Sequence, residues 1–361
     1  MAADLFGPAS RPACLAACAF LGLAAFAPVA GGFSQTAAQP PVPAQPGQSP
    51  AAASPPAPDQ GSADALFRSG AAALAAKDFT AAEEAFRQVR ELEPKNHRGL
   101  LALVETYLAQ NKADQALYFL ETASAAEPAS PDLALALGNV YLGTGKWDQA
   151  VSQYRKLLDA ADKQTKAAGE LYLAIGEAFR RKGDMPSAIA ALRNARLTLP
   201  NDGRVLTTLA LALDATSSWE AQQAYEDALR VAPDNGLVLN NLAFKLAENG
   251  GDLDRALSLA RHAQRLLPTM PDIADTLGWI YLKKDMASEA RATFAPLVQN
   301  QPGNANFRAH LAAALEWHNE TSPALQSLAK ALRDKPTDAN QRLVLELLKR
   351  SGLPTGAAAS K

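Results

Sequence analysis

The residue types that could catalyse a reaction or hold a metal are few in this chain and lie far apart. Its two cysteines, Cys14 and Cys18, are both close to the N-terminus, so a cluster of thiolate ligands cannot form in the rest of the chain. Its four histidines are widely separated, and none belongs to an HExxH zinc motif: His97, His262, His310 and His318. We therefore expect no enzyme activity, no metal site and no bound cofactor.

Amide and aromatic side chains are better candidates, and their chemistry is binding. The side chains of Asn139, Asn240 and Asn241 can both donate to and accept from a peptide backbone. Asn is a poor helix former, so its presence in Leu- and Ala-rich segments suggests a role, either toward a ligand or toward neighbouring helices. Phe244 and Trp279 are suited either to anchoring an apolar side chain of a partner or to internal packing.

The composition favours closely packed helices as the scaffold for these residues. The chain has 361 residues, of which 48% are hydrophobic and only 6% aromatic, and Ala is abundant. This mixture suits helices better than a β-sandwich. The formal net charge is -2, which argues against a general nucleic-acid binder, since such a protein needs a basic surface.

The first 33 residues are predicted to be a signal segment. Residues 13–30 are almost wholly apolar and follow Arg11, as in a secretory signal, and their length is also near that of a membrane-spanning helix. Residues 15–18, Leu-Ala-Ala-Cys, resemble a bacterial lipobox, in which Cys18 would carry a lipid. Cleavage, a retained membrane anchor and lipidation are three alternatives. Each predicts an exported protein that is periplasmic, secreted or tethered to a membrane.

Residues 34–62 are predicted to be a linker. This stretch has eight prolines, many Ala, Gln and Ser residues, one charged residue (Asp59) and no aromatic residue. Such a composition cannot bury a core, so we expect an extended, disordered linker between the signal segment and a folded body.

The folded body is a repeat. Prolines recur 33–35 residues apart, except for one gap of 72 residues that lacks a member: Pro94, Pro128, Pro200, Pro233, Pro268, Pro302 and Pro336. Within each unit, apolar residues at unit positions 4, 7, 8 and 11 form a stripe on one helix, and those at positions 20, 24 and 27 form a stripe on a second. Small residues at positions 8 and 20 allow the two backbones to approach closely, and the proline at position 32 ends the unit.

This pattern resembles the tetratricopeptide repeat (TPR). The resemblance covers residues 63–338 and implies an all-α solenoid, a right-handed superhelix of about eight helix-turn-helix repeats. The third unit has about four extra residues near 159–166, and the turn of the fifth is degenerate at 216–219. Residues 339–361 are predicted to be a capping helix and tail. The eight units are 63–96, 97–130, 131–168, 169–202, 203–235, 236–270, 271–304 and 305–338.

The resemblance also implies where a partner binds. The first helices of TPR units line a concave groove, into which unit positions 2, 5, 9 and 12 point. The residues at or beside these positions that are our candidates for contact with a protein or peptide partner are Asn139, Glu177, Arg180, Asn240, Asn241, Phe244, Asp275 and Trp279.

A narrower likeness suggests the setting. The run that begins Asn-Asn-Leu-Ala at residue 240 and includes Asp-Thr-Leu-Gly-Trp at 275–279 is similar to secreted bacterial TPR proteins, some of which belong to exopolysaccharide systems. We therefore expect a non-enzymatic scaffold or adaptor in the bacterial cell envelope, which binds protein segments in its groove. The alternative is an accessory subunit of an exopolysaccharide synthesis or export system, which contacts glycan through exposed aromatic rings.

Overall fold

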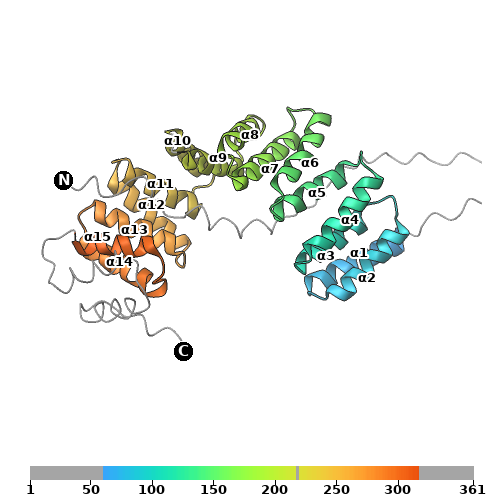
Figure 1. The fold of residues 1–361 in the computed structure, drawn as a ribbon, viewed down its shortest axis with the longest axis horizontal. Helices are drawn as coiled ribbons and strands as arrows, with labels where there is room; N and C mark the ends of the chain where they lie inside the picture. The colour runs from blue at the N-terminus through green and yellow to red at the C-terminus, as the bar shows by residue number, and fades with distance from the viewer. Residues whose placement is uncertain (1–59, 217–218, 317–361) are drawn as a thin grey trace, which may run out of the picture. The chain divides into compact units, whose positions relative to one another are not determined.

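A computed structural model describes residues 60–216 and 219–316, and these residues form fifteen α-helices and no β-strand (Figure 1). The helices fall into two compact units, which we call the N-terminal unit (60–182) and the C-terminal unit (183–316). The predicted signal segment, most of the predicted linker, the second helix of the last repeat and the capping helix lie outside the described residues. No helix in the described ranges has the length and apolar character needed to cross a membrane.

The N-terminal unit contains seven helices: α1 (Gln60–Ala75), α2 (Phe79–Leu92), α3 (Arg98–Ala109), α4 (Ala113–Ala126), α5 (Pro131–Gly143), α6 (Trp147–Ala160) and α7 (Lys166–Lys182). The C-terminal unit contains eight: α8 (Met185–Thr198), α9 (Gly203–Ala215), α10 (Glu220–Val231), α11 (Gly236–Glu248), α12 (Leu253–Leu266), α13 (Pro271–Lys283), α14 (Ala287–Asn300) and α15 (Ala305–Glu316). Odd-numbered helices are the first helices of the predicted repeats, and even-numbered helices are the second helices.

Two boundaries differ from the prediction. Helix α1 begins at Gln60, inside the predicted linker 34–62, because Pro58 is the last residue in the linker that would interrupt a helix. The extra residues near 159–166 form a longer connection after α6 and lengthen α7 to 17 residues, so that α7 begins three residues before its predicted unit.

The turn between the two helices of a repeat has the same conformation in the six repeats for which the structure describes unit position 15. The residue at unit position 15 has a positive φ, which is the left-handed conformation that closes a short turn after a helix. Glycine adopts it without steric cost, and the sequence indicates the turns at Gly145, Gly183 and Gly250. The same conformation is adopted where no glycine marks it, at Lys77, Asn111 and Asp285, with φ of 61°, 59° and 59°. In three repeats an Asp then caps the second helix: Asp78, Asp184 and Asp252.

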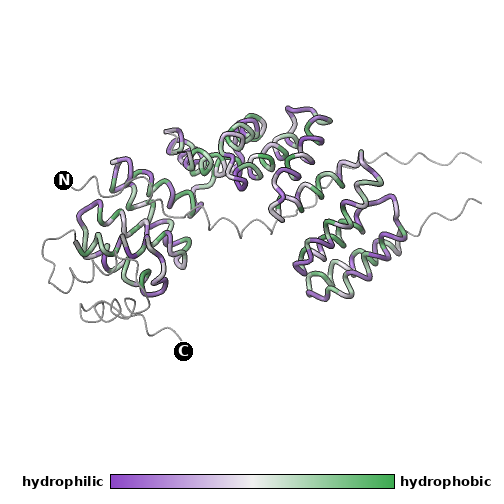
Figure 2. Tube along the Cα trace, viewed as in Figure 1, coloured by the Kyte–Doolittle hydropathy of each residue, from purple (hydrophilic) through white to green (hydrophobic). Residues whose placement is uncertain are grey.

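In three repeats, the two helices touch where a glycine of the first faces an aromatic ring of the second. A Cβ atom placed on Gly70 would lie 2.7 Å from the ring of Phe86, and one on Gly138 would lie 2.7 Å from the ring of Tyr154. A Cβ atom on Gly278 would lie 2.6 Å from the ring of Phe294. These aromatic side chains are fully buried. Figure 2 shows hydrophobic and hydrophilic residues along the same helices, as this amphipathic packing requires.

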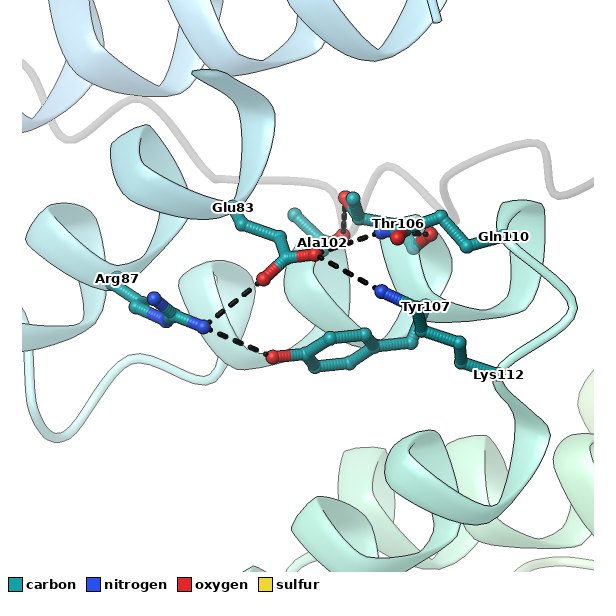
Figure 3. A network of polar contacts seen from close by, with 7 residues as sticks. All are labelled: Glu83, Arg87, Ala102, Thr106, Tyr107, Gln110 and Lys112. Atoms are coloured by element: carbon teal, nitrogen blue, oxygen red, sulfur yellow. Dashed lines mark hydrogen bonds and ion pairs between the residues drawn. The ribbon is translucent and has the colours of Figure 1, made fainter. Parts of the chain in front are cut away.

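Polar contacts link one repeat to the next on the side of the second helices. Glu83 of α2 accepts hydrogen bonds from Arg87 (3.0 Å) and from Gln110 of α3 (2.8 Å), while Arg87 also donates to the hydroxyl of Tyr107 (3.3 Å; Figure 3). The Arg87–Tyr107 spacing of 20 residues recurs further along the chain. There the Tyr141 hydroxyl donates to Glu121 at 2.8 Å, and Arg261 donates to the Tyr281 hydroxyl at 3.4 Å.

The glycine-to-ring contact gives a paired test on helix α5. Gly138→Ala should lower the free energy of unfolding by about 1–3 kcal/mol, because the added methyl group overlaps the buried Tyr154 ring. Gly143→Ala should leave it unchanged or raise it by up to about 1 kcal/mol, because nothing lies within 4 Å of the new Cβ and Ala favours a helix. Urea unfolding followed by circular dichroism measures both. Equal effects of the two substitutions would contradict the packing described here.

Candidate functional site

The first helices of the N-terminal unit each expose the same face. Residues at unit positions 5, 9 and 12 are spaced i, i+4 and i+7, so they lie on one side of a helix. We call this side the first-helix face. Its residues are Phe67, Ala71 and Leu74 on α1; Leu101, Glu105 and Leu108 on α3; Leu135, Asn139 and Leu142 on α5; and Leu173, Glu177 and Arg180 on α7.

Asn139 is half-buried at the centre of this face on α5. The hydroxyl of Tyr154, on the second helix of the same repeat, donates to Asn139 Oδ1 at 2.7 Å. Burial raises the pKa of Tyr154, which keeps this hydroxyl protonated and able to donate. Because Tyr154 occupies the amide oxygen, the Nδ2 group of Asn139 is the one that can donate to a ligand carbonyl.

Glu177 and Arg180 of α7 are bound to each other. Arg180 donates to both carboxylate oxygens of Glu177, at 2.8 and 2.9 Å, and Arg181 donates to the same carboxylate at 2.6 Å. Burial raises the pKa of Glu177, but the hydrogen bonds and charges of the two arginines outweigh this, so that its pKa lies below the ordinary value. Only 11% of the Arg180 side chain is exposed, so this pair offers a partner little free charge.

In the C-terminal unit, two candidates are not accessible. Asn240 is 2% exposed and Asp275 is 1% exposed. Both occupy unit position 5, and both lie on first helices that contact the next first helix, α11 with α13 and α13 with α15. The Nδ1 atom of His310 on α15 lies 2.8 Å from Asp275 Oδ1. The expectation that Asn240 and Asp275 point into an open groove is therefore wrong for this structure, because the following repeat covers them.

Trp279 is half-buried and held on several sides. Its indole N–H donates to Glu248 at 2.7 Å, and the Lys283 ammonium group lies 4.9 Å from the ring centroid. Its ring stacks on the imidazole of His310 at 5.1 Å and packs against the hydrophobic core around α14 and α15. Trp279 therefore packs between repeats. Phe244 and Asn241, on α11, remain half-buried.

His310 is the residue of this region that sequence reasoning missed. It occupies unit position 6, and in a stacked array this position lies beside position 5 of the preceding unit, which is Asp275. Comparing position 5 of one unit with position 6 of the next would have indicated the contact between Asp275 and His310. The spacing between the histidines does not indicate it.

A pocket on the first-helix face was also missed. It has a volume of about 450 Å³ and lies between α1 and α3, and its lining consists of Leu74, Ala75, Lys77, Phe79, Glu105 and Ala109. No single residue marks it in the sequence, since three segments form it together.

Within the described ranges, no three His, Cys, Asp or Glu side chains are grouped closely enough to hold a metal ion. The arrangement of the first-helix faces offers apolar side chains, amides and carboxylates, which are the groups that bind protein segments.

These features define a helical repeat protein, built from antiparallel helix pairs that stack on one another. The tetratricopeptide repeat model matches residues 73–122 and 107–171. A TPR repeat-containing protein of Pseudomonas aeruginosa is 26% identical over 174 residues, which are 48% of this chain and 29% of the relative. The match thus spans less than a third of that relative's length.

Solved structures share the fold. A TPR protein from Parabacteroides merdae superimposes with a TM-score of 0.51 at 15% identity, over 71% of this chain and 99% of that one. The C-terminal part of a TPR repeat-containing protein from Cytophaga hutchinsonii gives a TM-score of 0.51 at 18% identity, over 68% of this chain and 99% of that one. Residues 73–171 of the chain match the tetratricopeptide repeat family, and the predicted all-α TPR solenoid class is confirmed.

The buried His310–Asp275 contact gives a second paired test. His310→Ala should lower the free energy of unfolding of the C-terminal unit by about 2–3 kcal/mol, because it removes a buried hydrogen bond to a carboxyl group. His262→Ala should cost less than about 1 kcal/mol, because its partner Asp234 is 73% exposed. Urea unfolding of both variants measures the difference. A small loss for His310→Ala would show that this contact does not hold the repeats together.

Proposed function

We propose that this chain is a non-enzymatic adaptor of the bacterial cell envelope, which holds segments of partner proteins on the first-helix faces of its repeats. TPR proteins generally mediate protein–protein interaction and are generally not catalysts, and residues 73–171 of this chain match that family. The proposal adds a binding surface and a location to that general role.

One observation supports the choice of the first-helix face as the binding surface. Successive first helices of the N-terminal unit repeat a face of half-buried and exposed side chains, which the second helices leave uncovered. Asn139 lies on this face with its Nδ2 group available to a peptide carbonyl. In the C-terminal unit, Phe244 occupies the position that corresponds to Asn139, and Asn241 lies beside the face on the same helix.

The alternative of an exopolysaccharide accessory that contacts glycan receives no support from Trp279, the aromatic candidate on the first helices for such a contact. Stacking on a sugar requires a bare ring face. The Trp279 ring is contacted by His310, by Lys283 and by the core around α14 and α15. We therefore propose that the ligand of the first-helix faces is a protein segment.

The envelope location is supported by the sequence of the first 33 residues, which has the order of a basic residue, an apolar run and small residues. Its test is the intact mass of the protein purified from fractions of its native host. We expect the loss of about 30 residues, a lipid-modified chain that begins at Cys18, or a full-length chain in the membrane fraction. A full-length product in the cytosolic fraction would contradict export but would leave the binding proposal standing.

The binding surface is tested by affinity capture from an envelope extract of the host. Glu105→Lys together with Asn139→Asp changes exposed or half-buried groups of the first-helix face and should reduce the recovered partner by about tenfold or more. Tyr118→Ser, on the second helix α4, changes a side chain that is 66% exposed and should leave recovery unchanged. Partner recovery that falls with Tyr118→Ser and survives the double substitution would place binding on the opposite face.

A further inference from the structure

The first-helix faces of the two units have opposite polarity patterns. In the N-terminal unit, the outer rows at positions 5 and 12 are mostly leucine, and the centre row at position 9 is mostly polar. In the C-terminal unit, the centre row is apolar and position 5 is polar. The centre row of the N-terminal unit consists of Ala71, Glu105, Asn139 and Glu177. The centre row of the C-terminal unit includes Leu211, Phe244 and Trp279, and its position 5 includes Thr207, Asn240 and Asp275.

The leucines of the two outer rows in the N-terminal unit are not part of its core. Leu135 is 37% exposed, and Leu74, Leu101, Leu108 and Leu142 are half-buried. The core positions of the same helices, by contrast, are fully covered. Two rows of partly exposed aliphatic side chains therefore border a polar centre. At the α1–α3 end of the face, the pocket of about 450 Å³ is large enough for an aliphatic side chain.

The spacing of the two rows fits an extended peptide. Positions 5 and 12 are seven residues apart, which is about 10 Å along a helix that rises ~1.5 Å per residue. Successive side chains of an extended peptide point to opposite sides, so that alternate residues would reach the two leucine rows. The backbone would then lie over the centre row, where Asn139 Nδ2 can donate to a carbonyl and the Glu105 carboxylate can accept from an N–H group.

The charge of the face constrains the ligand further. Glu105 and Asp132 are exposed, and neither forms an ion pair with any residue that the structure describes. Lys77 at the rim of the pocket is the one basic residue of its lining. The Arg98 guanidinium near α1 is already bound to Glu93 and Asp64. The part of the face on α3 and α5 would therefore attract basic residues and repel acidic ones.

We propose that the N-terminal unit binds an extended segment of a partner protein, with large aliphatic side chains on both sides of its backbone and basic rather than acidic residues at its ends. This inference rests on the proposed function and narrows it, because it assigns the ligand to one unit and states its chemistry. The leucine rows and the pocket bind the side chains, the centre row binds the backbone, and Glu105 and Asp132 select the charge.

The test is fluorescence anisotropy of labelled peptides with the purified full-length chain. The probe is Lys-Leu-Ile-Leu-Thr-Leu-Ile-Lys. One control replaces both lysines by glutamates, and a second, Lys-Leu-Thr-Leu-Thr-Leu-Thr-Lys, is apolar on one side only. We expect the probe to bind at least about tenfold more tightly than either control.

Variants locate the binding. Leu101→Ser with Leu135→Ser should weaken binding of the probe by about tenfold or more, while Tyr118→Ser should not change it, and circular dichroism establishes that each variant is folded. Glu105→Lys with Asp132→Lys alters only exposed side chains and should reverse the preference, so that the glutamate peptide binds more tightly than the probe.

Equal binding of all three peptides would overturn the inference. It would also be overturned if the variant with Glu105→Lys and Asp132→Lys still bound the lysine probe more tightly than the glutamate peptide. If Asn241→Ala abolishes binding and the leucine variant does not, the C-terminal unit is the binding surface; the inference then fails while the proposed function stands. If no peptide binds and affinity capture also recovers no partner, both fail.

Discussion

Close packing between the two helices of a repeat is the constraint on which the remaining structure depends. At Gly70, Gly138 and Gly278, the first helix of a repeat approaches an aromatic ring so closely that a methyl group would overlap it. This contact fixes how the two helices of a repeat lie against each other. The left-handed residue at unit position 15 then reverses the chain in the same way in the six repeats whose position 15 is described. Within each of the two units, helix pairs built in this way can stack on their neighbours.

The stacking of one repeat on the next determines which polar residues are buried between repeats and which remain accessible to a partner. In the C-terminal unit, Asn240 and Asp275 are covered by the next first helix, and Asp275 is bound by His310. In the N-terminal unit, position 5 carries Leu101 and Leu135, which remain partly exposed. The same scaffold therefore holds one unit together through buried polar contacts and leaves an aliphatic border on the other. This difference is the physical basis for assigning ligand recognition to the N-terminal unit.

The sequence predicts the repeat well because its signals are local. The 34-residue period, the small residues at positions 8 and 20 and the glycines of the turns each act within one helix pair, and all agree with the helices observed. The burial of Asn240 and Asp275 could not be predicted in this way, since it depends on how closely a helix some 35 residues away approaches. The pocket beside Leu74 has the same origin, because it forms only when α1 and α3 lie side by side. Glu83 likewise looks like a solvated residue until the next repeat brings Gln110 to it.

Site-specific photo-crosslinking in the native host tests the central claim, that partner segments lie on the first-helix face. A photoreactive amino acid at position 105 or 135 should form a covalent adduct with a partner, since both side chains are exposed on this face. The same amino acid at position 118, which is 66% exposed on the second helix α4, should form none. Adducts from position 118 without adducts from positions 105 and 135 would contradict the account.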